Sequence, residues 1–393
     1  MPASHQVAGN QITLLRSGAE YFPQLCAAID AAQHLVYLET YIFYADETGR
    51  LISDALQRAA ARGVKAHLVL DGFGSAELPQ HWVDELRAAG VGMQWFRREI
   101  SPFTLQRNRH RRLRRMHRKM AVIDEQVAFV GGINIINDIP VYSDLTSPQM
   151  DYAVRVQGPV AEEVHSTMRH LWGALTWVNF RRRGKKIVWS NLVAKKQGTT
   201  PDITLVLRDN VRHRRDIERG YLKAIAGAQH EIIIANAYFL PGRTFRQALK
   251  KAAKRGVRVV LLLQGKAEYW IQHYATQALY DPLLAEGIEI YEYQPSYLHA
   301  KVAVIDELWA TVGSSNIDPY SLLLAREANL VIRDAGFAAE LRASLLEVIE
   351  KDALRVGDEY GGTRGLFGRL LSHLSYGLLR LAVGMLGHRK HGL

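Results

Sequence analysis

The residues with the clearest chemical potential form one motif that occurs twice in the chain. The motif places a histidine, a lysine two residues later, an aspartate five residues after the lysine and an asparagine ten residues after the aspartate. An imidazole can act as a nucleophile or as a general acid or base, whereas lysine and asparagine can stabilise negative charge. Together these residue types fit chemistry on a phosphate group. The two copies are His117, Lys119, Asp124 and Asn134, and His299, Lys301, Asp306 and Asn316.

The spacing within each copy predicts a strand that presents the histidine and the lysine on one surface, because residues i and i+2 of a strand face the same way. If the two copies meet, two imidazoles, two ammonium groups and two amides surround one point. One imidazole would attack the phosphorus of a phosphodiester, and the other would protonate the leaving alkoxide. Asp124 and Asp306 end apolar strands, so they are also candidates for structural partners of a lysine or of backbone groups.

Two other interpretations of these residues were weighed. A single H-x-K on a strand is usually a surface feature, but the pairing of two extended copies argues against that reading. A metal site is not expected, because the close histidine pairs, His110 with His117 and His388 with His391, lack a cysteine or carboxylate at zinc-type spacing. We expect neither a metal nor another cofactor.

The elements that position the motif repeat as well. RGVKAHLVLDG at 62–72 resembles RGVRVVLLLQG at 255–265, and apolar strands are predicted at 35–43 and 231–239. Strands that alternate with helices predict an α/β fold with two pseudo-symmetric α-β-α sandwich domains. We expect these domains at 1–185 and 200–356, joined by a polar, basic linker.

The charge of the chain indicates an anionic partner. Lysine and arginine number 50 against 39 aspartates and glutamates, a formal net charge of +11. The lone Cys26 excludes an internal disulfide framework and suits a reducing compartment. The first residues do not read as a signal peptide, and no conventional transmembrane helix is predicted. The tail at 361–393 is expected to contain an amphipathic basic helix, over 365–387, that lies in a membrane interface or packs on the protein.

The motifs HRKMAVID…GGIN and HAKVAVID…GSSN resemble the paired HKD motifs of the phospholipase D superfamily, over nearly the whole chain. Within it, the resemblance is to bacterial cardiolipin synthases of the shorter type without N-terminal membrane spans. It implies that the histidines, lysines and aspartates of both motifs are catalytic, with His117 as nucleophile and His299 as acid/base. It also implies that a carboxylate after each motif, Asp151 and Glu327, orients a catalytic imidazole.

The resemblance implies phosphatidyl transfer between phospholipids, with phosphatidylglycerol as acceptor, at the surface of an anionic cell membrane to which the protein binds peripherally. The donor lipid, the competition from water and the oligomeric state stay open. A basic insertion before the first motif would bind headgroups, with Arg112, Arg114, Arg115 and Arg118 as candidates.

Two alternatives to lipid synthesis share the site or the charge. A phosphodiesterase or nuclease on the same fold would suit the charge, but it has no use for an amphipathic tail, so no nucleic acid is expected as a partner. A non-enzymatic membrane-binding protein has no use for a duplicated site.

Overall fold

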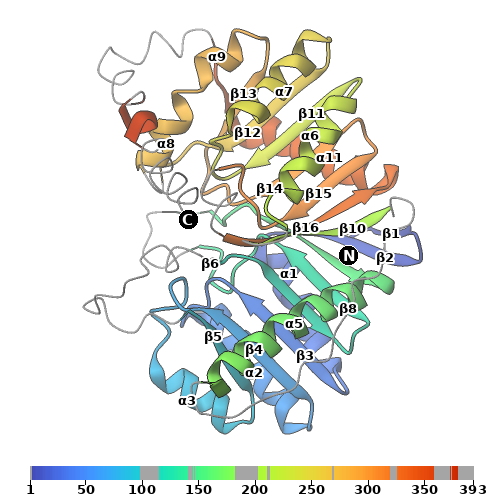
Figure 1. Ribbon diagram of the computed structural model, residues 1–393, viewed down its shortest axis with the longest axis vertical. Coiled ribbons are helices and arrows are strands. Elements are labelled where there is room, and N and C mark those ends of the chain that lie inside the picture. The colour runs from blue at the N-terminus through green and yellow to red at the C-terminus, as the bar shows by residue number, and fades with distance from the viewer. Residues whose placement is uncertain are drawn as a thin grey trace.

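The computed structural model describes residues 2–97, 115–139, 145, 147–181, 202–209, 213–267, 270–318, 325–357, 372 and 374–378. Two mixed sheets dominate it, one in each half of the chain (Figure 1). The first half contains β1 (Ser4–Val7), β2 (Asn10–Arg16), α1 (Ser17–Ala31), β3 (Leu35–Thr40), α2 (Glu47–Ala61), β4 (Lys65–Asp71), α3 (Gln80–Ala88), β5 (Gly92–Phe96), β6 (Arg115–Met116), β7 (Lys119–Ile123), β8 (Val127–Gly131), β9 (Tyr152–Gln157) and α5 (Pro159–Arg181).

The second half repeats this arrangement. It contains β10 (Ile203–Arg208), α6 (Asp216–Gly227), β11 (Glu231–Asn236), α7 (Arg243–Lys254), β12 (Arg258–Gln264), α8 (Trp270–Gln277), α9 (Tyr280–Leu284), β13 (Glu289–Tyr293), β14 (Lys301–Ile305), β15 (Trp309–Gly313), β16 (Ala325–Arg333), α11 (Ala335–Asp352) and β17 (Ala353–Arg355).

The strand order explains where the motifs lie. The first sheet runs β1-β2-β9-β8-β7-β3-β4-β5, and the second runs β10-β16-β15-β14-β11-β12-β13-β17. The motif strands β7 and β14 therefore occupy matching central positions, each antiparallel to the strand that follows the first helix of its half. Both are fully buried, which fits their nearly continuous apolar sequences.

The repeated Arg-Gly sequences end helices as predicted. Helix α2 begins at Asp46, whose side chain accepts the N–H of Gly49, and it ends before Gly63, which has φ of 87°. In the second half, α7 ends before Gly256, with φ of 89°. A residue at this position must adopt the left-handed conformation, which glycine does without steric cost. The strand that follows then begins within three residues in both halves.

The layers of the molecule confirm the predicted pair of α-β-α sandwiches. Helices α1, α2 and α3 cover one face of the first sheet, and α6, α7 and α9 cover one face of the second. The inner faces of both sheets, with α5 and α11, form a single apolar core that spans the two halves. The halves are therefore joined by buried apolar surface, the strongest general source of association.

Some predicted features fall on residues outside the described ranges. These are most of the basic insertion, including Arg112 and Arg114, the linker with both expected domain limits, and most of the tail at 361–393. Within the described residues, no helix combines the length and the apolarity needed to cross a bilayer.

Candidate active site

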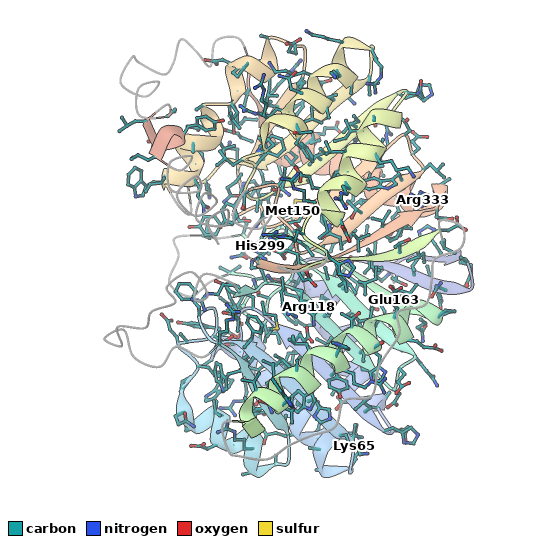
Figure 2. All side chains as sticks on the ribbon, viewed as in Figure 1. Lys65, Arg118, Met150, Glu163, His299 and Arg333 are labelled. Atoms are coloured by element: carbon teal, nitrogen blue, oxygen red, sulfur yellow. The ribbon has the colours of Figure 1, made fainter. Side chains whose placement is uncertain are left out.

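Backbone pairing between the two halves positions both catalytic histidines. In the first half, β6 pairs in parallel with β16, and the N–H of His117 donates to the carbonyl of Arg326 at 2.9 Å. In the second half, the N–H of His299 donates to the carbonyl of Met150 at 2.8 Å. Figure 2 shows Met150 and His299 together between the two halves. His117 thus lies beside the residue that precedes Glu327, and His299 lies beside the residue that precedes Asp151.

Each orienting carboxylate therefore binds the histidine of the opposite half. Nδ1 of His117 lies 3.1 Å from both carboxylate oxygens of Glu327, and Nδ1 of His299 lies 2.6 Å from Oδ2 of Asp151. A carboxylate at Nδ1 favours the tautomer that carries its proton there. Both rings then present an unprotonated Nε2. Their side chains are 16% and 17% exposed, enough for a substrate to reach that atom.

The two carboxylates are themselves held in different ways. A Cβ atom added at Gly132 would come within 2.3 Å of an Asp151 carboxylate oxygen, so only glycine leaves room for that side chain. At the matching position of the second half, the Ser314 hydroxyl donates to Glu327 at 2.6 Å and accepts the N–H of Ala328 at 3.1 Å. The shorter carboxylate is therefore paired with a glycine, and the longer one with a serine.

Two buried lysines supply the positive charge of the site. Lys119 is 3% exposed and Lys301 is 0% exposed. The Lys119 ammonium donates to the carbonyl of His117 at 2.6 Å, and Lys301 makes the equivalent bond to His299. Buried ammonium groups attract an anion strongly, because little water screens them.

Burial controls the protonation of these groups. It lowers the pKa of Lys119 to about 7, and it lowers the pKa of His299 to about 4 with help from Lys301. Burial also lowers the pKa of His117, against the opposing effect of Glu327. Burial alone would raise the pKa of Glu327, but His117, Lys119 and the Ser314 hydroxyl hold it below its usual value. At neutral pH the imidazoles are therefore neutral and the glutamate is ionised.

The asparagines lie at the same edge of the two sheets. Asn134 is 8% exposed, and its Oδ1 accepts the N–H of Ile42 at 3.2 Å. Asn316 is 3% exposed, and its Oδ1 has no hydrogen-bond partner among the described residues. The two asparagines thus follow β8 and β15, and the first is tied to the turn after β3.

The two motif aspartates do not join the site. Asp124 follows the last residue of β7, and its carboxylate accepts the N–H groups of Gln33, His34 and Leu35 at 2.7–2.9 Å. Although burial opposes it, these three bonds hold the pKa of Asp124 below its ordinary value. Asp306 binds the start of β11 in the same way. Both carboxylates hold backbone at the far end of the motif strand, which is the structural role weighed for them beside catalysis.

Arg118 also has a different role from the one expected. Its guanidinium makes two hydrogen bonds to Glu39, at 2.5 and 3.0 Å, and the two side chains are 5% and 0% exposed. Arg118, which lies between β6 and β7, therefore forms a buried ion pair with Glu39 and is not exposed to a headgroup. Arg115 is 16% exposed, 4.0 Å from Asp71 and stacked on Phe73, so it alone of the described candidates is accessible to a headgroup.

The described part of the tail packs on the protein with one side only. Ser372 and Ser375 are buried, and the Tyr376 ring lies 5.9 Å from the Arg246 guanidinium. Leu374 and Leu378 are 59% and 56% exposed. The side that contains Tyr376 therefore faces α7, while Leu374 and Leu378 face outward.

Three residues near the site were missed from the sequence. The Tyr41 ring lies 4.8 Å from the His117 ring and 5.3 Å from the Lys119 ammonium. Arg208, opposite Glu327 on β10, is 2% exposed and its guanidinium donates to the carbonyl of Ala325; burial lowers its pKa to about 10. Ser314 was visible only as a variable position in the motif. The position of Tyr41 directly after the strand that pairs with the motif strand was the one available signal.

Comparisons with known proteins agree with this geometry. A family profile described as "Cardiolipin synthase, PLD-like domain" matches residues 25–172 and 221–349. Cardiolipin synthase B of Escherichia coli K12 is 40% identical over 380 residues, covering 96% of this chain and 90% of that protein. The major cardiolipin synthase ClsA of Bacillus subtilis is 28% identical, covering 86% of this chain and 68% of that protein.

Among solved structures, a phosphatidylserine synthase from Haemophilus influenzae superposes with a TM-score of 0.71 at 14% identity, covering 95% of this chain and 94% of that one. This likeness shows that the fold is shared. The repeated profile match and the 40% identity over nearly the whole chain establish more. The chain belongs to the phospholipase D-like family of cardiolipin synthases.

Proposed function

We propose that this protein is a cardiolipin synthase that transfers a phosphatidyl group to the glycerol headgroup of phosphatidylglycerol. The observation that carries the proposal is the pair of imidazoles, each bound at Nδ1 by a carboxylate of the opposite half, between two buried lysines. The 40% identity to cardiolipin synthase B over 96% of the chain supports the choice of lipid substrates over other phosphodiesters.

The reaction has two balanced steps. Nε2 of His117 attacks the phosphorus of the donor lipid, the bond from phosphorus to the headgroup oxygen breaks, and His299, charged at Nε2, gives its proton to the departing oxygen. The hydroxyl of a second phosphatidylglycerol then transfers its proton to Nε2 of His299, its oxygen bonds to phosphorus, and the bond to His117 breaks. The lipid phosphate lies between the two rings in both steps, as an in-line displacement requires.

The charged neighbours of the rings support this assignment. The ammonium groups of Lys119 and Lys301 stabilise charge on the non-bridging oxygens, which grows at the transition state. The incoming phosphodiester carries a negative charge, which raises the pKa of Lys119 and of His299. Substrate binding therefore favours the charged forms that the first step needs, although burial alone holds both pKa values down.

We also propose that the protein binds the membrane peripherally. The outward leucines at 374 and 378 and the surrounding basic tail would enter an anionic interface, where each basic residue adds about 1 kcal/mol of attraction. Removal of residues 361–393 should weaken co-sedimentation with phosphatidylglycerol vesicles. Unchanged co-sedimentation would contradict this part of the proposal.

The decisive experiment uses purified protein with phosphatidylglycerol vesicles and EDTA. We expect cardiolipin and free glycerol as products, and a phosphate-labelled protein adduct that is absent from His117→Ala. The exposed His81 provides the matched control, because His81→Ala removes an imidazole away from the site. Absence of lipid products together with cleavage of DNA would overturn the proposal in favour of a nuclease, and an adduct that persists in His117→Ala would exchange the roles of the two histidines.

A further inference from the structure

The two halves of the active site are not equally enclosed. Glu39 pairs with Met120 of the first motif strand as Ala235 pairs with Val302 of the second, so Tyr41 and Ala237, two residues further on, occupy matching positions. Tyr41 covers His117 and Lys119. Ala237, whose N–H donates to the carbonyl of Ala300 at 3.0 Å, presents only a methyl group beside the second motif. The second half therefore has space where the first has an aromatic ring.

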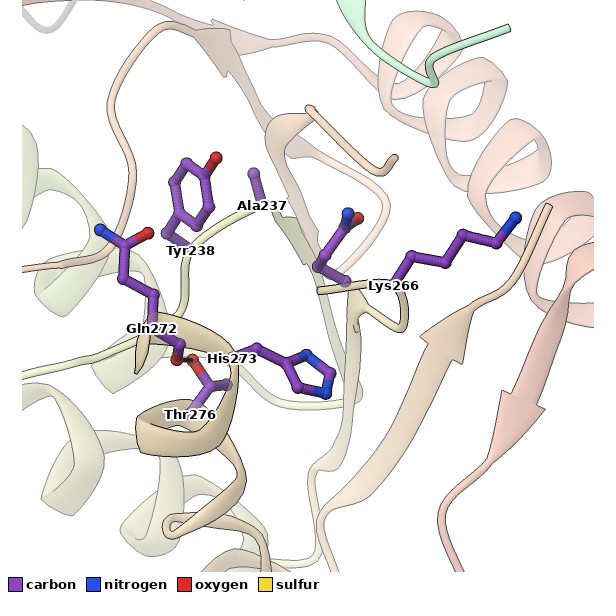
Figure 3. A pocket seen from close by; sticks show the side chains of 7 residues that line it. Ala237, Tyr238, Lys266, Gln272, His273 and Thr276 are labelled. Atoms are coloured by element: carbon purple, nitrogen blue, oxygen red, sulfur yellow. Dashed lines mark hydrogen bonds between the residues drawn. The ribbon is translucent and has the colours of Figure 1, made fainter. Parts of the chain in front are cut away.

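A pocket occupies that space. It is small and open to solvent, and it lies between the ends of β11 and β12 and helix α8. Tyr238 and Gln272 stand on one side and Lys266 on the other, with His273 between them (Figure 3). The pocket adjoins the catalytic centre, because Oε1 of Gln264, one of its lining residues, accepts the N–H of Leu298, the residue before His299.

Apart from the Lys266 ammonium, the described lining is uncharged and rich in hydrogen-bonding groups. Nε2 of Gln264 and Oε1 of Gln272 are buried atoms without a partner among the described residues, one a donor and the other an acceptor. Buried polar atoms of this kind are rare in folded proteins and require an explanation such as a ligand or water. Thr276 adds a hydroxyl, and the Lys266 ammonium is bound to the carbonyl of Pro295 at 2.9 Å.

The same lining argues against other headgroups. The described residues that line the pocket include no carboxylate, so they offer a cationic amine no counter-charge. A hydrocarbon would leave the two amide atoms unpaired. A small polyol satisfies them, because each of its hydroxyl groups both donates and accepts.

We infer that this pocket binds the glycerol headgroup, as the leaving alcohol in the first step and as the incoming alcohol in the second. The inference rests on the proposed phosphatidyl transfer and extends it by naming the subsite. In-line transfer places the alcohol opposite the nucleophile. A glycerol subsite beside His299 therefore also fits His299 as the acid/base and the covered His117 as the nucleophile.

The test is a competition between acceptors. Protein in mixed micelles of phosphatidylglycerol and a neutral detergent is given labelled glycerol, ethanolamine or ethanol, and the exchanged lipids are quantified. We expect wild-type protein to prefer glycerol. Gln272→Leu should raise the KM for glycerol roughly tenfold, the equivalent of one lost hydrogen bond of about 1.4 kcal/mol, and leave ethanol transfer unchanged. Ile271→Ala, on the same helix but outside the pocket, is the matched control.

A second variant tests the space itself. Ala237→Tyr places beside the second motif the kind of ring that Tyr41 provides beside the first. It should reduce the rate of glycerol exchange more than the rate of ethanol exchange. Equal losses for glycerol and ethanol in both variants, or no loss in either, would overturn the inference. Failure of the proposed function looks different, because wild-type protein would then form no exchanged lipid with any alcohol. Thermal unfolding of each variant shows whether a loss of exchange activity comes from misfolding. If Ala237→Tyr misfolds, the result for Gln272→Leu decides the test.

Discussion

Replacing Glu327 by glutamine tests the crossed arrangement of the site most directly. The carboxylate has two hydrogen-bond partners. One of its oxygens accepts the Ser314 hydroxyl at 2.6 Å, and both oxygens lie 3.1 Å from Nδ1 of His117. A glutamine amide has only one oxygen to offer. If it serves the serine, its NH₂ group faces the imidazole, and the ring must carry its proton on Nε2. That tautomer has no lone pair at the nucleophilic atom.

The expected magnitude has two parts. Loss of a hydrogen bond to a charged group costs about 1.5–3 kcal/mol, or roughly 10–150-fold in rate. Selection of the wrong tautomer can cost about 10⁴-fold, as in serine proteases that lose the charge of their orienting aspartate. We therefore expect Glu327→Gln to slow adduct formation by between roughly 10²-fold and 10⁴-fold.

The assay separates the nucleophile from the acid. A donor lipid with a p-nitrophenyl leaving group needs no proton from His299, so its rate of adduct formation reports on His117 alone. Glu327→Gln should lose this rate although Glu327 lies in the opposite half of the chain. Asp151→Asn, the matched variant, should retain it and lose activity with phosphatidylglycerol, whose glycerol must be protonated. The crossed pairing is refuted if Asp151→Asn stops nitrophenol release and Glu327→Gln does not.

Three further predictions concern packing and charge. Gly132→Ala should lower activity at least tenfold, about 1.4 kcal/mol, because its Cβ would displace the neighbouring carboxylate; Gly220→Ala, in open space on α6, should not. Arg118→Met should lower the free energy of unfolding by about 3–5 kcal/mol in chemical denaturation, and adding Glu39→Gln should recover most of it. Lys119→Met should abolish activity yet stabilise the fold. The pKa of Lys119 falls from 10.5 to about 7, so the unfolded chain binds its proton more tightly and wild-type stability rises between these pH values. The stability gap between variant and wild type should therefore shrink from about pH 6.5 to about pH 9, and a constant gap would contradict the buried charge.

The local features of the fold were predictable from the sequence because they depend on neighbouring residues. The strand predicted at 35–43, the helix stops at Arg-Gly and the central motif strands all follow from apolar runs and glycine positions. The structure confirms them, although the first strand ends earlier, at Thr40. The set of orienting carboxylates was also named in advance. Their crossing was not, because it depends on how β6 meets β16, a contact between segments 210 residues apart.

Asp124 and Arg118 show a different limit. Asp124 shares its spacing with the catalytic residues, but a duplicated motif repeats structural contacts as faithfully as chemical ones, and its carboxylate caps the start of β3. Arg118 lies between two catalytic residues, yet its guanidinium pairs with the buried Glu39. The charge of Arg118 is therefore neutralised inside the protein.

The exchange of carboxylates between the halves has a consequence for the direction of the reaction. The arrangement is that of an isologous dimer, in which each subunit completes the other's site about a two-fold axis. Two identical subunits would have to present the same walls on both sides of the phosphorus. A fused chain is free of that restriction, because each half can change without the other. Tyr41 in the first half corresponds to Ala237 in the second, and Gly132 corresponds to Ser314, so the two sides of the site differ. One side can then hold the covalent lipid while the other exchanges alcohols.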